Sequence, residues 1–594
     1  MKNILVLACI LLSLTACKEN TSTTNEELST TTSDSFSALL NDYYNENLMA
    51  HPLEATFMGD NTYNNVLPNV LDDNFIATEK AYLTRFKYEV NTFEDSDLTE
   101  SQQLSKAVLN WECDINLSRL NFTAYTPVDQ MWSINLMIGQ FASGASAQPF
   151  KTVEDYKNWL ERVDGFLLWM QSAEDNMKAG IKAKHVLPKS LIVKVLPQLK
   201  ALTTKDLSAH LFYKPITNLP DGFSEEDKTN LTQDYKSMVL DKIVPAFEQL
   251  HTFMGTDYML AGRISSGISD IPNGEAYYKH QIKLYTTTDM SADEIHKLGL
   301  TEVARILSEM EKVKKQVGYE GDIISFFDHV RNKKELMPFT TPEEVIENFN
   351  AIYNKMKPQV DKLFNIQPKT TFEVRRTEAF REASASAEYN PGSIAANRPG
   401  VFYVPIPDTK TYNIYSDESL FLHEAIPGHH FQISLQQENE NLPKFRKALW
   451  YSAYGEGWAL YTESLGKELG LYTDPYQYFG NLSAEMHRAI RLVVDTGIHT
   501  KGWSREKAIE YSLKNEAESE ESITREIERY MANPGQALSY KIGQLKILEL
   551  RAKAEEQLGD KFQISEFHNQ ILEPGCIPLA LLQEKINAWI ESNK

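Results

Sequence analysis

The sequence is poor in the residues that interrupt or cross-link a fold. It has four cysteines, 27 glycines and 24 prolines in 594 residues. Glycine and proline together are about 9% of the chain against a usual ~12%, which disfavours a turn-dense β-sandwich or barrel and favours long helices. So few cysteines in so long a chain exclude a small disulfide scaffold. With 42% hydrophobic residues, the chain is also not intrinsically disordered.

Basic residues and long apolar runs are scarce as well. The chain has 60 Lys and Arg against 82 Asp and Glu, a net charge of −22 at pH 7. This excess of acid argues against a nucleic-acid-binding surface, so we expect no nucleic acid as a partner. Beyond the amino-terminal segment no apolar stretch approaches the length that a bilayer requires, so we expect no membrane-spanning helix.

The segment 1–17 is typical of an export signal. Lys2 precedes an apolar run, 4–12, that is too short to cross a bilayer but fits the core of a signal peptide. The run leads to Leu14, Thr15, Ala16 and Cys17, which resembles the bacterial lipobox, where cleavage leaves the cysteine to be lipidated. We predict a signal peptide at 1–16 and a lipid anchor at Cys17. An ordinary secretory peptide with an incidental cysteine is the alternative.

The anchor would place the protein in the bacterial cell envelope. Lys18 and Glu19 follow the cysteine, in place of the aspartate associated with inner-membrane retention, which favours the outer membrane. The segment 17–35, which is rich in Ser and Thr and contains no aromatic residue, is predicted to be a lipidated cysteine with a flexible tether. Cys113 and Cys576 would be the remaining thiols, and either a disulfide or two buried thiols fits the sequence.

The body of the chain has mostly helical periodicity. The segment 36–336 is predicted to be an amino-terminal helical half, and the segment 337–594 a catalytic half. Helix starts are indicated at Ser291, by a capping box, and at Thr341, by a following proline and glutamates. The exceptions are short strands at 371–375 and 400–404, joined through a turn-rich segment at 389–392. The sequence therefore predicts a mainly α fold with a small β-sheet.

The stretch from His423 to His430 carries the strongest chemical signal. His423 is followed by Glu424, and His429 and His430 come shortly afterwards. An imidazole that binds a metal, next to a carboxylate that can reach a metal-bound water, is what a zinc hydrolase needs. Three surface histidines without a metal are the alternative.

The familiar spacing of His-Glu-x-x-His is broken here, because Pro427 stands four residues after His423. In a regular helix His423 and His429 would lie about 9 Å apart along the axis, too far to share one zinc ion. Proline and the glycine at 428 can distort a helix, so we interpret the motif as one with two inserted residues. His430 is the alternative second ligand, and His429 is favoured.

A third ligand is expected from a helix further along the chain. Glu456 and Glu463 both follow His429, within a segment that has helical periodicity. Downstream glutamates on the next helix complete the site in some zinc peptidases. Glu456 is favoured because Gly455 and Gly457 flank it and allow close helix packing. Glu463 would be a supporting group or a substitute ligand, and a solvated glutamate on the protein surface is the favoured alternative.

The motifs together give a resemblance to a known family. The sequence resembles the DUF885 family of bacterial proteins, predicted gluzincin-type zinc metallopeptidases, over most of residues 40–590. Besides 423–432, the segments that carry this resemblance are 272–278, 286–289, 294–300, 389–392, 456–461, 491–499 and 533–543. It implies a large helical fold similar to the carboxypeptidase Taq and angiotensin-converting-enzyme group, with a substrate channel, and one zinc ion held by His423, His429 and Glu456.

Further site residues follow from helical spacing together with this resemblance. Arg488, Arg491, Asp495 and His499 fall three and four residues apart and could form a polar stripe that orients a ligand; a surface ladder of ion pairs is the alternative. Tyr540 is the candidate for polarising the oxyanion, with a buried core tyrosine as the alternative. Tyr389 and Tyr403 are candidate substrate contacts, because the strand at 401–404 could receive a peptide by strand addition.

These residues together predict a zinc-dependent peptidase. Glu424 would act as general base, and short peptides, trimmed as by an aminopeptidase or dipeptidyl peptidase, would be the substrates. The main rival is a nutrient-binding outer-membrane lipoprotein for sugars or peptides, without metal or turnover. A peptidase fold that has lost its activity is a third possibility.

Overall fold

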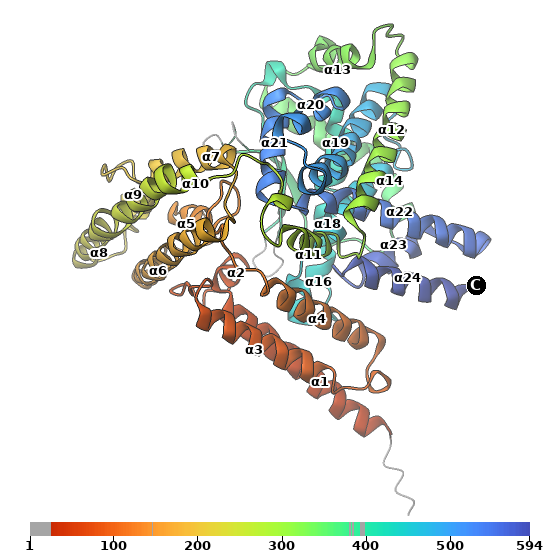
Figure 1. The fold of residues 1–594 in the computed structure, drawn as a ribbon. Coiled ribbons are helices and arrows are strands. Elements are labelled where there is room, and N and C mark those ends of the chain that lie inside the picture. The colour runs from red at the N-terminus through yellow and green to blue at the C-terminus, as the bar shows by residue number, and fades with distance from the viewer. Residues whose placement is uncertain (1–24, 145, 379–381, 383–384, 393–397) are drawn as a thin grey trace, which may run out of the picture.

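The structure is a computed structural model that describes residues 25–144, 146–378, 382, 385–392 and 398–594 (Figure 1). The predicted signal peptide and Cys17 lie outside the described residues. The described chain is mainly helical with one small three-stranded sheet, as the sequence predicts. No helix in this part is both long and apolar enough to cross a membrane.

The first helices form an elongated layer along one side of the molecule, coloured red and brown in Figure 1. Their bounds are α1 Asn25–Ala50, α2 Pro52–Phe57, α3 Asp73–Val90, the short helix η1 Asp95–Asp97 and α4 Glu100–Arg119. Residues 25–35, expected to belong to a flexible tether, are therefore the start of α1. The Gln102 side chain of α4 donates a hydrogen bond to Ser33 Oγ at 2.8 Å, which ties this part of α1 to α4.

A lobe of helices projects from the body, coloured orange to yellow-green in Figure 1. It has its own core, which includes Trp159, Phe166, Trp169, Phe212 and Phe247. Its elements are α5 Ile134–Ala142, α6 Val153–Ala183, α7 Lys189–Ala201, η2 Leu211–Asn218, α8 Glu225–Ser237, η3 Met238–Ile243, α9 Val244–Phe253, η4 Met254–Tyr258 and α10 Met259–Ala261.

The body is built from the remaining elements. Up to the sheet these are η5 Ile268–Asp270, α11 Gly274–Thr286, α12 Ala292–Gln316, α13 Ile323–Asn332, η6 Lys334–Leu336 and α14 Pro342–Leu363. After the sheet come η7 Thr409–Thr411, η8 Ile414–Ser416, α15 Asp417–Glu424, α16 His429–Glu438, α17 Lys444–Ala448, α18 Ser452–Ser464, α19 Pro475–Thr500, α20 Arg505–Asn515, α21 Glu520–Ala532, η9 Gln536–Leu538, α22 Ser539–Leu558, η10 Gly559–Lys561, α23 Ile564–Leu572 and α24 Leu579–Asn593.

The helix starts expected from the sequence are present. Ser291 and Thr341 cap α12 and α14, each with a complete capping box. The apolar face of α12 then packs along α19, so that these two helices run side by side through the body. Cys113 and Cys576 are both buried free thiols, so they form no disulfide.

The small sheet contains one strand more than expected. Strands β1 Phe372–Arg376 and β3 Gly400–Val404 are parallel, and β2 Glu388–Asn390 pairs antiparallel with β3. The order β1-β3-β2 places β3 in the centre. Tyr389 and Asn390, expected in a turn, are thus part of a strand.

The buried cores cross the seam expected at residue 336. That seam falls between η6 and α14, but the largest core joins apolar residues of α1, α3 and α4 to those of α14, the sheet, α18 and α22 to α24. A further core joins α12 and α13 to α19 and α21. Segments distant in sequence therefore meet around α15, α16 and α18, where the histidine motif lies.

Candidate metal centre

The histidine motif spans a break between two helices. His423 and Glu424 end α15, and His429 begins α16. We expected a locally distorted helix; instead the helix stops and residues 425–428 connect the two parts. A Cβ on Gly428 would lie 1.9 Å from the carbonyl oxygen of His423, so only glycine allows the chain to fold back this closely. The break brings the rings of His423 and His429 to 4.8 Å between centroids.

The favoured ligand set comes together in space. Nε2 of His423 lies 3.5 Å from Oε2 of Glu456, and Nε2 of His429 lies 3.6 Å from the same oxygen. Candidate ligand atoms of the three residues all lie within 4.8 Å of one another. Bonds of about 2.0–2.1 Å in tetrahedral geometry separate neighbouring ligand atoms by roughly 3.3–3.5 Å, so two imidazoles and one carboxylate fit one zinc ion.

Glu456 reaches the histidines because α18 packs closely against α22. A Cβ on Gly457 would lie 2.5 Å from the backbone of Gly543, so the two helices touch through glycines. The other flanking glycine, Gly455, lies against the indole ring of Trp450. The close packing expected around Glu456 is present.

Glu463 supports the site from behind His423. Its Oε1 accepts a hydrogen bond from Nδ1 of His423 at 2.8 Å, and its Oε2 accepts one from the hydroxyl of Ser419 at 2.6 Å. Because a carboxylate only accepts, Nδ1 carries the hydrogen and Nε2 is the atom that can bind a metal. Glu463 is buried, so the structure places it as the partner of a histidine, away from the surface.

The electrostatics of the cluster favour a bound cation. Burial lowers the pKa of His423, but the carboxylates of Glu456 and Glu463 outweigh it and raise that pKa to about 10. Burial raises the pKa of Glu456, but the two imidazoles hold it well below its ordinary value. Burial also raises the pKa of Glu424. A metal bound to His423 would displace a proton from this imidazole, so affinity should fall at acid pH.

His430 points away from the cluster. Its Nδ1 lies 2.9 Å from the hydroxyl of Tyr389, and its ring lies 5.1 Å from that of Phe372 on β1. Burial lowers its pKa to about 4, so it is a neutral side chain packed beneath the sheet. The geometry therefore places His429, and not His430, beside His423 and Glu456.

A cavity of about 700 Å³ opens onto the cluster. Expected site residues that line it, besides the three candidate ligands, are Tyr389, Glu424, Arg488, Arg491 and Tyr540. Arg491 lies over the ring of Tyr540, 4.5 Å from its centroid. The candidate general base, the candidate for polarising the oxyanion and two arginines thus share one cavity with the candidate metal ligands.

The cavity also contains residues that the sequence analysis missed. Nη2 of Arg491 lies 2.8 Å from Glu526 on α21, and His487 lies between Glu516 and Glu526. Arg529, Trp450, Ser522 and Glu518 also line the cavity. His487 could have been found, because it precedes Arg491 by one helical turn, but the acidic and basic residues of α21 look like those of any exposed helix face.

The predicted polar stripe on α19 is divided in two, and the expectation is wrong for its second half. Asp495 accepts hydrogen bonds from the hydroxyl of Tyr278 at 2.5 Å and from the backbone N–H of Gly535 at 3.1 Å. His499 is bonded to backbone groups of Ile268 and Tyr530. Both side chains are fully buried outside the cavity, because α19 leaves the cavity and enters the body after Arg491.

The proposal of strand addition onto β3 is also wrong. Tyr403 lies on the central strand, with β1 on one side and β2 on the other, so β3 cannot receive another strand. Tyr403 does not line the cavity, whereas Glu388 and Tyr389 of the edge strand β2 do. A peptide bound along the sheet within this cavity would therefore meet β2, the edge strand that lines the cavity.

Together the fold and the site define a class: a large helical protein with a buried His-His-Glu cluster at the wall of a charged cavity. The chain belongs to the family described as "Bacterial protein of unknown function (DUF885)", whose model matches residues 52–586. A comparison with curated proteins found no match.

Two solved structures share the whole fold. A "putative lipoprotein" from Colwellia psychrerythraea is 27% identical and superposes with a TM-score of 0.83, over 94% of this chain and 99% of its own. A "putative lipoprotein of unknown function" from Shewanella oneidensis is 18% identical, with a TM-score of 0.74 over 92% and 99%. PZ peptidase A with an inhibitor aligns at 12% identity over 87% and 97%, but its TM-score of 0.29 supports no argument.

Proposed function

We propose that this protein is a zinc-dependent peptidase of the bacterial envelope that trims short peptides, in the manner of an aminopeptidase or dipeptidyl peptidase. The observation that carries the proposal is the convergence of His423, His429 and Glu456, with Glu424 beside them on the wall of the cavity. Two imidazoles and a carboxylate are ligands that zinc prefers, and they leave a position open for water or substrate.

Zinc bound by these three residues would supply a Lewis acid and a more acidic water molecule. Glu424 would take the proton from that water and return it to the leaving amine. Its raised pKa suits it to hold a proton between these two transfers. The hydroxyl of Tyr540 would donate a hydrogen bond to the oxygen of the scissile carbonyl.

The arginines would position the substrate. The Nη1 atom of Arg491 is buried and has no hydrogen-bond partner among the described residues. Leaving a buried donor unsatisfied is costly, and a carboxylate of the substrate would satisfy it. Arg488, whose Nε is likewise unsatisfied in the described chain, stands on the same wall. An anchor for a peptide carboxylate near the metal favours short peptides.

The envelope location rests on the export signal at 1–17 and on the similarity to two proteins described as lipoproteins. Cys17 would carry the lipid and hold the protein on the membrane, with the outer membrane as the proposed site.

Metal content tests the proposal most directly. The full chain, purified without chelator or immobilised nickel, should hold about one zinc ion per chain by mass spectrometry. Glu456→Ala should lose it, because one of the three ligands is removed. Glu440→Ala, at an exposed loop position, is the matched control and should keep it.

Turnover separates a peptidase from a binding protein. Glu424→Gln should retain zinc and lose about 10²–10⁴-fold in the rate of peptide hydrolysis, because the general base is removed. A mixture of short peptides analysed by mass spectrometry provides the assay. Absence of zinc from the wild-type protein even after zinc is supplied would contradict the proposal and favour a nutrient-binding lipoprotein.

A further inference from the structure

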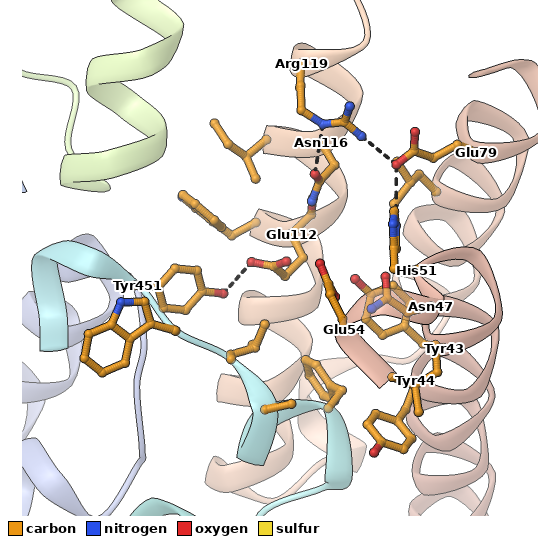
Figure 2. Close-up of a pocket in the computed structure, with 18 of the residues that line it drawn as sticks. Tyr43, Tyr44, Asn47, His51, Glu54, Glu79, Glu112, Asn116, Arg119 and Tyr451 are labelled. Carbon is orange, nitrogen blue, oxygen red and sulfur yellow. Dashed lines mark hydrogen bonds and ion pairs between the residues drawn. The ribbon is translucent and has the colours of Figure 1, made fainter. Parts of the chain in front are cut away.

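A second cavity, of about 770 Å³, lies between α1 to α4 and the chain that joins α17 to α18 (Figure 2). Trp450 lines both this cavity and the one at the candidate metal centre. The ring of Trp450 lies 5.7 Å from that of His429. The two cavities therefore share one wall, immediately beside a candidate zinc ligand.

The second cavity, which we call the acidic cavity, carries more negative than positive charge. Glu54, Glu79 and Glu112 line it, and Arg119 is the one lysine or arginine among the described lining residues. Arg119 is already engaged, because its Nη2 lies 2.6 Å from Oε1 of Glu79. His51 faces Glu79 too, at 3.7 Å. Figure 2 shows both of these groups directed at Glu79, apart from Glu112.

Glu112 and Glu54 thus face the cavity with no ion-pair partner among the described residues. Glu112 accepts a hydrogen bond from the hydroxyl of Tyr451 at 2.7 Å, drawn in Figure 2. Burial above all, and then the charge of Glu54, raise the pKa of Glu112 to about 7. A cation beside Glu112 would relieve this unfavourable burial of charge.

Aromatic rings form much of the remaining wall. Tyr43 and Tyr82 are stacked with centroids 6.2 Å apart, and Trp111 meets Tyr451 edge to face at 4.9 Å. The faces of such rings attract ammonium and guanidinium groups, and carboxylates add to the attraction. Carboxylates and aromatic rings together are suited to an organic cation of the size of an amino-acid residue.

The cavity at the metal centre carries charges of both signs, and it includes arginines where the described wall of the acidic cavity has only the engaged Arg119. There, Arg491 is more than nine-tenths buried, and its Nη1 lacks a partner in the described chain. A molecule that spanned both cavities would meet a cation-binding region on one side of Trp450 and a carboxylate-binding region on the other. A short peptide carries these two charges at its two ends.

We propose that the acidic cavity binds the cationic part of the peptide substrate, either its α-ammonium group or a lysine or arginine side chain on the amino side of the scissile bond. This proposal rests on the peptidase function proposed above. Glu112 and Glu54 would pair with the cation, and Trp450 would lie along the peptide between the two cavities.

Binding of small cations to the full chain tests this without any need for turnover. The probes are norleucine amide, which has only an α-ammonium group, N-acetylarginine amide, which has only a guanidinium group, and N-acetylnorleucine amide, which has neither. Calorimetry or ligand-observed NMR should detect binding of the first or the second, and none of the third. Binding of the first probe would identify the α-ammonium group of the peptide as the cation, and binding of the second would identify a basic side chain.

The variants locate the binding. Glu112→Gln keeps an acceptor for Tyr451 and should weaken binding of the cation at least about tenfold, as expected for loss of a charged hydrogen-bond partner. Glu54→Gln, at an exposed position that folding tolerates, should also weaken it. Asp114→Asn is the matched control, because Asp114 lies on the same helix but points out of the cavity and pairs with Lys87. This variant should bind the cationic probe as tightly as the wild type does.

The outcomes distinguish this inference from the peptidase proposal. Equal binding of the cation by wild type and both glutamine variants, or failure of both cationic probes to bind, would overturn the acidic cavity as the subsite even if zinc and turnover are present. Binding that depends on Glu112, in a protein that lacks zinc and turnover, would uphold a cation site and refute only the enzyme.

Discussion

At the scale of single residues, the site depends on groups that hold the candidate ligands in place. Glu463 is the clearest example, because it binds His423 through the nitrogen that would not face the metal. Such partners of a metal-binding histidine fix its orientation and increase its basicity.

The first prediction concerns this partner. Glu463→Gln should lower zinc affinity by about 10–100-fold without abolishing binding, because all three ligands remain. Competition with a coloured zinc chelator measures the change, and Glu440→Gln serves as the control. An affinity equal to wild type would mean that Glu463 plays no part in orienting His423.

A second prediction at this scale concerns Glu112 and pH. Its pKa is about 7 in the folded protein against an ordinary value of 4.5. The folded state therefore holds this proton more tightly than the unfolded chain, and the resulting stability is present below pH 4.5 and lost as the pH rises through 7. The slope contributed by one group is at most about 1.4 kcal/mol per pH unit.

Glu112→Gln should remove this contribution. Its free energy of unfolding, measured by denaturant titration between pH 5 and 8, should decline less with pH than that of the wild type. Parallel curves for the two proteins would show that Glu112 does not titrate in this range.

At the scale of elements, the sequence predicted which residues form the candidate metal cluster better than it predicted the helix break that brings them together. The types and order of His423, Glu424 and Glu456 indicated the candidate cluster, but they left His429 and His430 as alternatives for its second histidine. The end of α15 could not be foreseen, because proline and glycine are compatible with a kink, a bulge or a complete break. Only the packing of Gly428 on the carbonyl of His423 decides between them.

Two errors at this scale have the same origin. Periodicity placed Asp495 and His499 on one stripe with Arg491, but it cannot tell which turn of a helix leaves a cavity. A strand-like run at 400–404 does not reveal its position within a sheet, and the short strand β2 made it the central one. Long capped helices such as α12 and α14 were predictable, because their signals are local.

The break between α15 and α16 gives a direct prediction. Gly428→Ala would place a methyl group against backbone atoms, so it should shift His429 and lower both zinc content and stability, the latter by about 1–3 kcal/mol. Gly222→Ala, which meets nothing within 4 Å, is the control and should leave both unchanged. Normal zinc binding by Gly428→Ala would show that the connection tolerates movement.

At the scale of the whole molecule, the predicted mainly α fold with one small sheet is confirmed. Membership of the DUF885 family is also confirmed, because the family model matches residues 52–586. The arrangement of the buried cores could not be predicted from the sequence, because no local pattern indicates that α1, α3 and α4 pack in one core with α22 to α24. The acidic cavity was missed for the same reason, because its carboxylates come from three separate helices.

The predicted lipid anchor at Cys17 can be tested at this scale. Cys17→Ser should move the protein from the membrane fraction to the soluble fraction and abolish incorporation of labelled fatty acid, since the thiol that accepts the lipid is gone. Cys113→Ser, at a buried free thiol, is the control. Membrane association that persists in Cys17→Ser would contradict the lipoprotein assignment.

The largest core unites the two ends of the described chain. Phe36, Leu40 and Tyr43 of α1 belong to the same core as Leu582, Ile586 and Ile590 of α24. A chain exported from its amino end, as the signal at 1–17 predicts, cannot complete this core until its last helix has emerged. During export, the apolar faces of the first helices would therefore stay exposed until α24 has crossed the membrane. We expect this protein to need envelope chaperones for longer than a protein whose domains fold one after another from the amino end.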